Sequence, residues 1–316
     1  MKKIILVSIV ILFIVSICVA GSFAKYPERN ITLICPYGAG GATDIAARVF
    51  ANVANKHFLE GISIIVENMP GSSGLKADSY IVRTKADGYT IYCLNTSTAR
   101  TTQHSPTKIA AFQPIGMYVF DPLVLVVSKD SEVSNLEDIL ESSKSEKGTS
   151  LCTSGSANLT YLMGRIIEDE VPGVKFRYVN ADSGAMQIQQ LLGGHVDAGF
   201  ITIGEAYGQL ESGNFKALAY SGDKRHPVFS DIPTLQEKGI DIVIGAGRGI
   251  GVSAQTPEEI VDYLADFCQK VINSEIFVEE MEKSGFPVTY KDPENYKEFL
   301  MTYENKITPL AIELGL

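Results

Sequence analysis

A glycine-rich loop at residues 36–44 has residue types and spacing suited to binding an anion. It joins a strand-like apolar run, Ile31 to Cys35, to a helical pattern from Asp44 to Phe58. The first N–H groups of a helix have no intrahelical partner and attract negative charge, and glycines let a ligand approach the backbone closely. We therefore predict a small-carboxylate site here. Its expected binding residues are Tyr37, Gly38, Ala39, Gly40, Gly41 and Thr43.

Two other interpretations of this loop remain open. Gly38, Gly40 and Thr43 match a dinucleotide-binding pattern whose third glycine is replaced, with Glu67 placed to accept a hydrogen bond from a ribose. Alternatively, the glycines form a tight turn and bind nothing.

Polar residues also follow other strand-like runs, where ligands of open parallel sheets bind. The loop 154–158 repeats the strand-to-helix arrangement, so it either holds a second carboxylate or only caps its helix. Asp182 either accepts a hydrogen bond from a ligand hydroxyl or caps the next helix. Arg100 is expected in solvent rather than on the ligand. The further candidate ligand-binding residues are Asn95, Thr96, Ser97, Ser154, Gly155, Ser156, Asn158, Asp182, Ser183 and Thr202.

Short β-type runs alternate with helical patterns along most of the chain, which predicts βαβ units and a largely parallel sheet. Residues 134–137 have the pattern of a capping box that opens a helix. The last helical patterns have no sheet of their own to cover, so we expect them to return to the first lobe. The predicted fold is α/β with two lobes, residues 25–121 plus 246–316 and residues 122–245, joined by two hinge crossings near 121 and 231–245 around a cleft.

Composition excludes several functions. The chain has 316 residues and a net charge of −10, so it lacks the basic field that nucleic acid binding needs. The cysteines and histidines have no metal-ligand spacing, and we expect no metal and no cofactor. Cys35, Cys93, Cys152 and Cys268 are either buried thiols or contribute to a disulfide. No Ser–His–acid grouping is evident, so we do not expect an enzyme.

The first residues predict export. Lys2 and Lys3 precede an apolar run, Ile4 to Ala20, and small residues at Ser22 and Ala24 then form a cleavage site. We predict a signal peptide at residues 1–24 and a periplasmic or extracytoplasmic mature protein with a charge of −12, since two lysines and no acids are removed. The alternative is an uncleaved anchor.

Several motifs in the order of the chain resemble the solute-binding proteins of tripartite tricarboxylate transporters, the TctC or Bug family. They are residues 26–31, 36–44 with Arg48, 66–74, 86–90, 191–197, 218–219, 231–235 and 248–249. The resemblance implies a periplasmic binding protein of the type II fold that closes on a small carboxylate and delivers it to membrane permease subunits. It also implies that the loop 37–43 holds a carboxylate through backbone amides, partly through water.

The resemblance leaves the solute open, because Ala181 and Ala246 stand where larger residues are common. We expect a monomer. The alternatives to a transport receptor are a carboxylate sensor for a membrane kinase, which would use the same cleft, and an exported enzyme, which would need a reactive group there.

Overall fold

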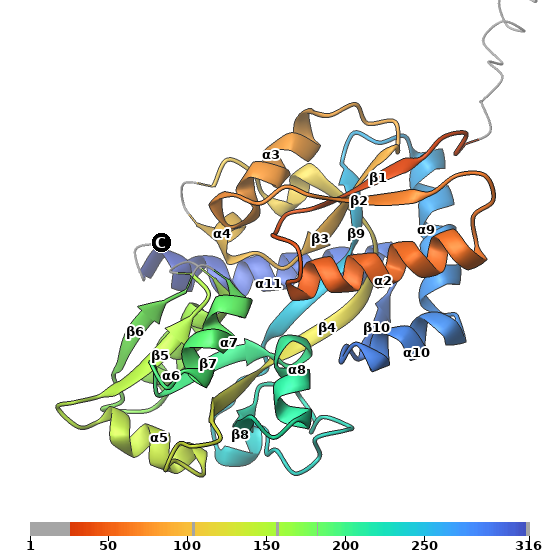
Figure 1. Cartoon of the computed structure of the whole chain (residues 1–316). Helices are drawn as coiled ribbons and strands as arrows, with labels where there is room; N and C mark the ends of the chain where they lie inside the picture. Colours follow the sequence, from red (N-terminus) through yellow and green to blue (C-terminus); the bar gives the residue numbers. More distant parts are fainter. Residues whose placement is uncertain (1–25, 103–104, 156–157, 182, 314–316) are drawn as a thin grey trace, which may run out of the picture.

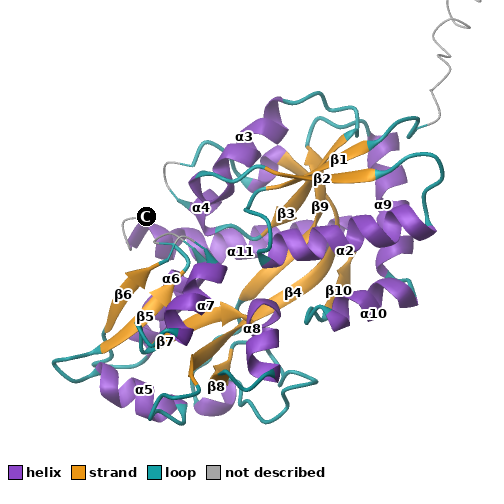
Figure 2. Cartoon of the chain, in the orientation of Figure 1, coloured by secondary structure: helices purple, strands orange, loops and turns teal. Residues whose placement is uncertain are grey.

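A computed structural model describes residues 26–102, 105–155, 158–181 and 183–313. Two α/β lobes lie one above the other in the view of Figure 1, and the long strand β4 runs between them. Helices cover the strands of each lobe (Figure 2). The predicted signal peptide lies outside the described residues.

Strands and helices alternate as the local apolar patterns predict. The strands are β1 Ile31–Cys35, β2 Ile64–Asn68, β3 Thr90–Asn95, β4 Phe112–Ser128, β5 Thr149–Thr153, β6 Phe176–Asn180, β7 Ala198–Thr202, β8 Phe215–Tyr220, β9 Gly245–Ser253 and β10 Val288–Lys291. The α-helices are α2 Ala42–His57, α3 Leu75–Arg83, α4 Thr98–Thr101, α5 Leu136–Ser143, α6 Leu159–Glu170, α7 Gly184–Leu192, α8 Ile203–Glu211, α9 Glu258–Ile272, α10 Glu275–Lys283 and α11 Pro293–Glu313. Short 3₁₀ turns lie at Ser72–Gly74, Ile109–Ala111 and Gln236–Lys238.

The sheet is mixed rather than largely parallel. Its strand order is β2-β1-β3-β9-β4-β7-β5-β6, with β10 and β8 also paired to β4. The pairs β1–β2, β1–β3, β5–β6 and β5–β7 are parallel, as the βαβ pattern predicts. The pairs of β9 with β3 and β4, and of β4 with β7, β8 and β10, are antiparallel. The prediction of a largely parallel sheet was wrong at β4 and β9. Whether two strands run parallel or antiparallel depends on partners far away in the sequence and not on the local residue pattern.

The strand β4 changes partners along its length. Residues Phe112 to Pro122 pair with β9, and residues Leu123 to Ser128 pair with β7 and β8. One backbone segment therefore belongs to the sheets of both lobes. The carboxyl ends of β1 and β3 on one side, and of β5 and β7 on the other, consequently meet near this junction.

The C-terminal helices return to the first lobe only in part. In one core, Phe277 of α10 and Leu264 of α9 pack with Phe50 of α2, as expected. Tyr296 of α11 also packs in the first lobe, but Ile307 of the same helix lies in the core of the second. A helix of 21 residues is about 30 Å long, enough to contact both lobes.

Two local predictions have definite outcomes. The cap of α5 is Asn135 rather than Ser134: its Oδ1 accepts the N–H of Asp138 at 2.9 Å, while Asp138 accepts the N–H of Ser134 at 3.1 Å. The four cysteines of the described residues are free buried thiols. Within the described part of the chain, no helix has the length and apolar character to cross a bilayer.

Candidate functional site

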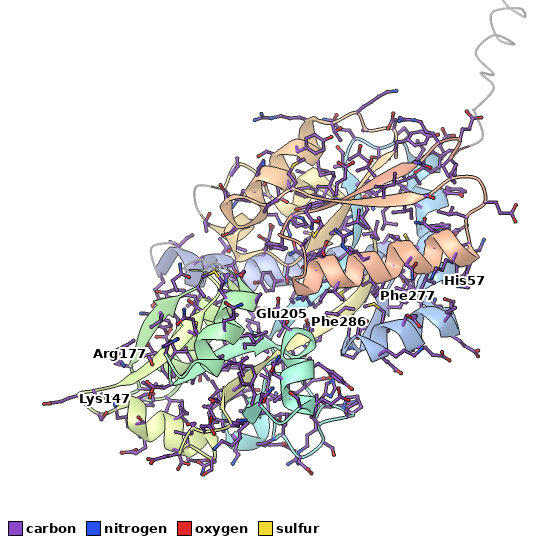
Figure 3. The ribbon with its side chains drawn as sticks, in the orientation of Figure 1. His57, Lys147, Arg177, Glu205, Phe277 and Phe286 are labelled. Carbon is purple, nitrogen blue, oxygen red and sulfur yellow. The ribbon has the colours of Figure 1, made fainter. Side chains whose placement is uncertain are left out.

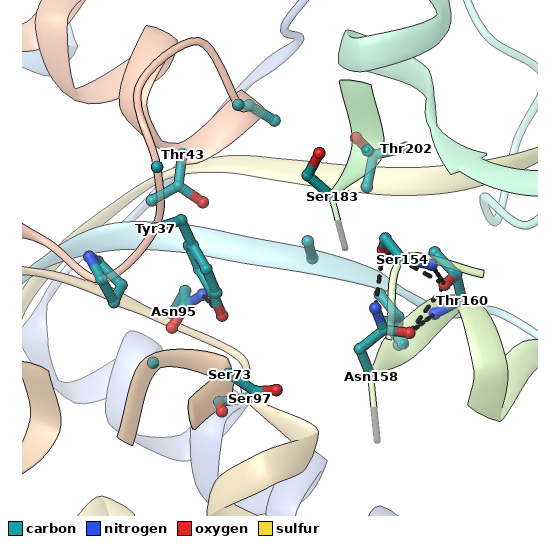
Figure 4. Close-up of a pocket in the computed structure, with 18 of the residues that line it drawn as sticks. Tyr37, Thr43, Ser73, Asn95, Ser97, Ser154, Asn158, Thr160, Ser183 and Thr202 are labelled. Atoms are coloured by element: carbon teal, nitrogen blue, oxygen red, sulfur yellow. Dashed lines mark hydrogen bonds between the residues drawn. The ribbon is translucent and has the colours of Figure 1, made fainter. Parts of the chain in front are cut away.

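A cavity of about 550 Å³ lies at the junction of the two lobes (Figure 4). Its walls come from strand-end loops of both lobes, as the sequence predicts. The lining residues of the first lobe are residues 36–39, 41–43, 70–74, 95–99, Ala246 and Arg248. Those of the second are Leu123, Ser154, Asn158, Leu159, Thr160, residues 183–185, Thr202 and Glu205.

Asp44, in the first turn of α2, shapes the glycine-rich loop. Its Oδ2 accepts the Gly40 N–H at 2.9 Å and the Arg48 Nε–H at 2.9 Å, and its Oδ1 accepts Asn68 Nδ2 at 2.8 Å. Burial opposes the charged carboxylate, but these three hydrogen bonds outweigh it and lower the pKa of Asp44. Gly40 adopts φ 83°, which favours glycine, and its N–H is already used. Arg48 therefore braces the loop.

The hydroxyl of Tyr37 lies beside Asn95 on the first-lobe wall. Asn95 Nδ2 donates to Tyr37 Oη at 3.0 Å, and Tyr37 also packs near Gly74. Burial raises the pKa of Tyr37, so the phenol stays protonated at neutral pH. Ser97 caps α4, although its hydroxyl accepts the Arg100 N–H only at 3.4 Å.

The second-lobe loop both caps a helix and lines the cavity. Asn158 Oδ1 accepts the N–H groups of Thr160 and Tyr161, each at 3.1 Å, so the capping interpretation is confirmed. Asn158 Nδ2 donates to Ser154 Oγ at 2.7 Å, which aims both side chains along the wall (Figure 4). Ser183 likewise caps α7, by accepting the Met186 N–H at 3.2 Å.

Glu205 is a cavity residue that the sequence reasoning missed. It lies at the junction of the lobes (Figure 3), where its Oε1 accepts the Ala42 N–H of α2 at 3.3 Å and its Oε2 accepts the Thr202 hydroxyl at 3.4 Å. A second-lobe carboxylate thus occupies part of the helix terminus assigned to a ligand. Burial raises the pKa of Glu205, while Arg248 opposes that shift. The pattern Thr202-x-x-Glu205 at a strand end was the available signal.

Arg248 is a second charged residue that lines the cavity and that the sequence did not indicate as a binding residue. Its Nη1 pairs with Asp121 and its Nε donates to Thr43 Oγ1 at 3.2 Å, while Asp121 also accepts the Gly204 N–H at 3.0 Å. Among the described lining residues, Arg248 and Glu205 are the charged side chains, and Arg248 is already paired with Asp121. A carboxylate in this cavity would therefore rely on hydroxyl and amide donors.

The loop 71–74, part of a motif that resembles the family, also lines the cavity. Ser72 and Ser73 have φ 48° and 52°, a conformation that residues with a Cβ rarely adopt. Such strain is common at binding sites, but the sequence carries no direct signal for it.

The cavity brings together most of the predicted site residues. Lining it are Tyr37, Gly38, Ala39, Gly41, Thr43, Asn95, Thr96, Ser97, Ser154, Asn158, Ser183 and Thr202. Gly40 and Gly155 are outside the lining set, and Ser156 and Asp182 lie outside the described residues. Ligand contact stays a prediction for all of them. The prediction for Arg100 was wrong: its side chain is 2% exposed and pairs with Asp78 at 3.0 Å, because α3 and β3 enclose it.

Comparisons with known proteins agree on one family. The profile of the "Tripartite tricarboxylate transporter family receptor" (TctC) matches residues 46–316. A curated relative from Cupriavidus necator, "UPF0065 protein in gbd 5'region", is 30% identical, with 92% of this chain and 89% of the relative covered. A TctC solute-binding protein from Polaromonas, solved without ligand, is 30% identical with a TM-score of 0.72, covering 92% of this chain and all of that one.

Other solved structures share the fold. The periplasmic binding protein BugD is 27% identical with a TM-score of 0.81, covering 92% of this chain and 99% of that one. An R. palustris protein solved with adipate is 24% identical with a TM-score of 0.82, over 91% and 98% of the two chains. MatC of Rhodopseudomonas palustris, solved with malate, is 22% identical with a TM-score of 0.77, over 90% and 100%.

Proposed function

The chain belongs to the tripartite tricarboxylate transporter receptor family, and on this basis we propose that it captures a small di- or tricarboxylate and delivers it to the permease of such a transporter. Proteins of this family are solute receptors and not enzymes. The observation that carries the proposal is the cavity itself: strand-end loops at helix N-termini face it from both lobes, lined by hydroxyls and backbone amides.

The charge of the cavity supports a ligand held by neutral donors. Arg248 is paired with Asp121, so its positive charge is balanced before a ligand enters. Hydrogen bonds from neutral donors to a carboxylate are strong when water is excluded, as between two closing lobes. The adipate and malate in the two R. palustris relatives belong to this chemical class, and we extend that class to this chain.

We also propose the sequence-based lobe boundaries, residues 25–121 plus 246–316 and residues 122–245, with export by removal of residues 1–24. The change of partners along β4 between Pro122 and Leu123 supports the first boundary. The periplasmic relatives support the location.

A ligand panel tests the binding step. Isothermal titration of the mature protein with succinate, adipate, L-malate and citrate should show one site for at least one of them, and mass spectrometry should recover that compound unchanged. Chemical conversion of the ligand, or no binding by the panel, would contradict the proposal.

Gly41→Val should abolish that binding while the protein still folds. Gly41 has φ −79°, and a Cβ there would meet only Gly38 O at 3.7 Å and Glu205 Oε1 at 3.9 Å. The added side chain is thus tolerated by the backbone but fills the cavity at the start of α2. Gly208→Val, in open space on α8, is the matched control and should bind normally. Normal binding by both variants would place the ligand elsewhere.

Delivery to a permease needs a cellular measurement. Cells that lack this gene should lose uptake of the radiolabelled ligand, the intact gene should restore it, and the Gly41→Val variant should not. Unchanged uptake without the gene would favour the sensing alternative.

A further inference from the structure

The buried ion pair between Arg100 and Asp78 lies directly behind the first-lobe wall. Arg100 Nη1 is 3.0 Å from Asp78 Oδ1, and both side chains are 2% exposed. Asp78 also accepts the Tyr92 hydroxyl at 2.7 Å and the Thr107 hydroxyl at 3.3 Å. Each of these bonds restricts the ion pair, so the position of the guanidinium is held independently of any ligand.

The second guanidinium nitrogen fixes which way the Asn95 amide points. Arg100 Nη2 donates to the backbone oxygen of Asn95 and lies 3.3 Å from Asn95 Oδ1. A guanidinium has donors and no acceptor, so the amide oxygen of Asn95 must face it. The Nδ2 group is then directed at Tyr37 Oη, 3.0 Å away.

This orientation determines what the Tyr37 hydroxyl can do. An amide NH₂ only donates, so the phenol oxygen accepts from Asn95 and has its own proton left to give. Among the described residues, no hydrogen bond takes that proton. Tyr37 lines the cavity (Figure 4), so an acceptor there can receive it.

We infer that Arg100, acting through Asn95, makes Tyr37 a hydrogen-bond donor toward the cavity, so that this wall selects a ligand group that accepts, such as a carboxylate oxygen. The inference rests on the proposed function and adds to it a named selecting side chain. Arg100 is a positioning residue, because it lies outside the cavity lining and acts through Asn95.

A double-mutant cycle tests this coupling, with adipate and L-malate as probes in isothermal titration. Tyr37→Phe should weaken binding about tenfold, as expected for loss of one hydrogen bond to a charged group. The pair Asp78→Asn with Arg100→Gln leaves no buried charge unpaired, yet the introduced glutamine can face Asn95 with either end of its amide. In that background, adding Tyr37→Phe should weaken binding about threefold or less.

Arg100→Lys is the conservative rescue. Lysine also has donors only, so the Asn95 orientation and the roughly tenfold effect of Tyr37→Phe should persist. If Arg100 merely stabilised the fold, Tyr37→Phe would change the dissociation constant by the same factor in every background. Equal factors in all backgrounds would therefore overturn the inference. So would a Tyr37→Phe variant that binds as well as the unaltered protein.

Asn95→Asp provides a second test in case the double variant Asp78→Asn with Arg100→Gln fails to fold. The introduced carboxylate would pair with Arg100 and accept the Tyr37 proton, which reverses the hydrogen bond. Adding Tyr37→Phe to Asn95→Asp should then change affinity less than about twofold, and a tenfold loss there would contradict the inference. If the unaltered protein binds neither probe and no other compound of the panel, the proposed function itself is contradicted. If it binds normally and Tyr37→Phe has the same effect on affinity in every background, only this inference is contradicted.

Discussion

At the scale of single residues, Glu205 competes with the proposed carboxylate ligand for a backbone N–H at the start of α2. Its carboxylate is half-buried beside the first turn of α2 and accepts the Ala42 N–H at 3.3 Å. Folding therefore removes water from this charge and returns only long hydrogen bonds and the attraction of Arg248. The side chain is placed to link the two lobes, but at a cost to stability when it is ionised.

Glu205→Gln should raise the melting temperature at pH 7.5. Because burial raises the pKa of Glu205 in the folded protein above its ordinary value of 4.5, charging it destabilises the fold as pH rises through the folded pKa. As pH falls below 4.5 the carboxyl becomes protonated in both states, so the difference between variant and unaltered protein should become small near pH 4. Differential scanning calorimetry across this range measures it.

Glu211→Gln is the matched control, since Glu211 ends the same helix and is exposed. It should change the melting temperature little at either pH. A Glu205→Gln variant that melts lower at pH 7.5 would mean that the ionised carboxylate stabilises the junction.

At the scale of elements, glycines let β9 and β4 approach closely. This brings Arg248 of β9 within ion-pair distance of Asp121 of β4. A Cβ at Gly249 would collide with the backbone oxygen of Gly116 and with Met117 Cα at 2.7 Å. Tyr296 of α11 closes the same space from the other side. The position is restricted by packing, because the glycine does not need a left-handed φ.

Gly249→Ala should destabilise the protein by about 1–3 kcal/mol, since the strand or the helix must move to admit one methyl group. Gly208→Ala, on α8 with nothing near its Cβ, should instead stabilise by up to about 1 kcal/mol through helix propensity. Urea unfolding of both variants gives the comparison. Equal effects at the two sites would show that backbone entropy, and not the strand contact, dominates at Gly249.

At the scale of the whole molecule, the antiparallel strands β4 and β9 run between the lobes, and α11 packs in the cores of both. The strand β4 pairs with sheets of both lobes, and β9 begins at Gly245, where the chain comes back from the second lobe. We propose that β4 and β9 bend at this junction when the lobes rotate, and that the contacts of α11 with the second lobe shift at the same time.

A saturating dicarboxylate should reduce the radius of gyration measured by small-angle scattering, because a ligand held from both walls favours the closed population. Gly41→Val, which blocks the cavity, should show no such change under the same conditions. The scattering curve also reports whether the protein is the monomer that we expect. An unchanged curve for the unaltered protein with bound ligand would mean a rigid cleft.

Local pattern accounts for much of the fold and for the position of the cavity. Apolar periodicity predicts elements such as β1 Ile31–Cys35 and α2 Ala42–His57 within a few residues, and βαβ alternation implies that loops such as 36–44 and 154–158 lie at strand ends. Asn158 acts as a cap as its type predicts. These features depend on neighbours in the chain, so the sequence alone carries them.

Long-range packing decided the rest. The sequence could not reveal that β4 runs unbroken from Phe112 to Ser128, that α11 reaches both cores, or that Arg100 is enclosed rather than solvated. It also could not place Glu205 against Ala42, 163 residues away along the chain. By itself the sequence determined the alternation of strands and helices and the polar strand-end loops, because side-chain type and periodicity act locally. Only the tertiary structure decided which polar groups are paired and which face the cavity with an unused hydrogen-bond donor. The physical reason is that pairing depends on residues that only folding brings together.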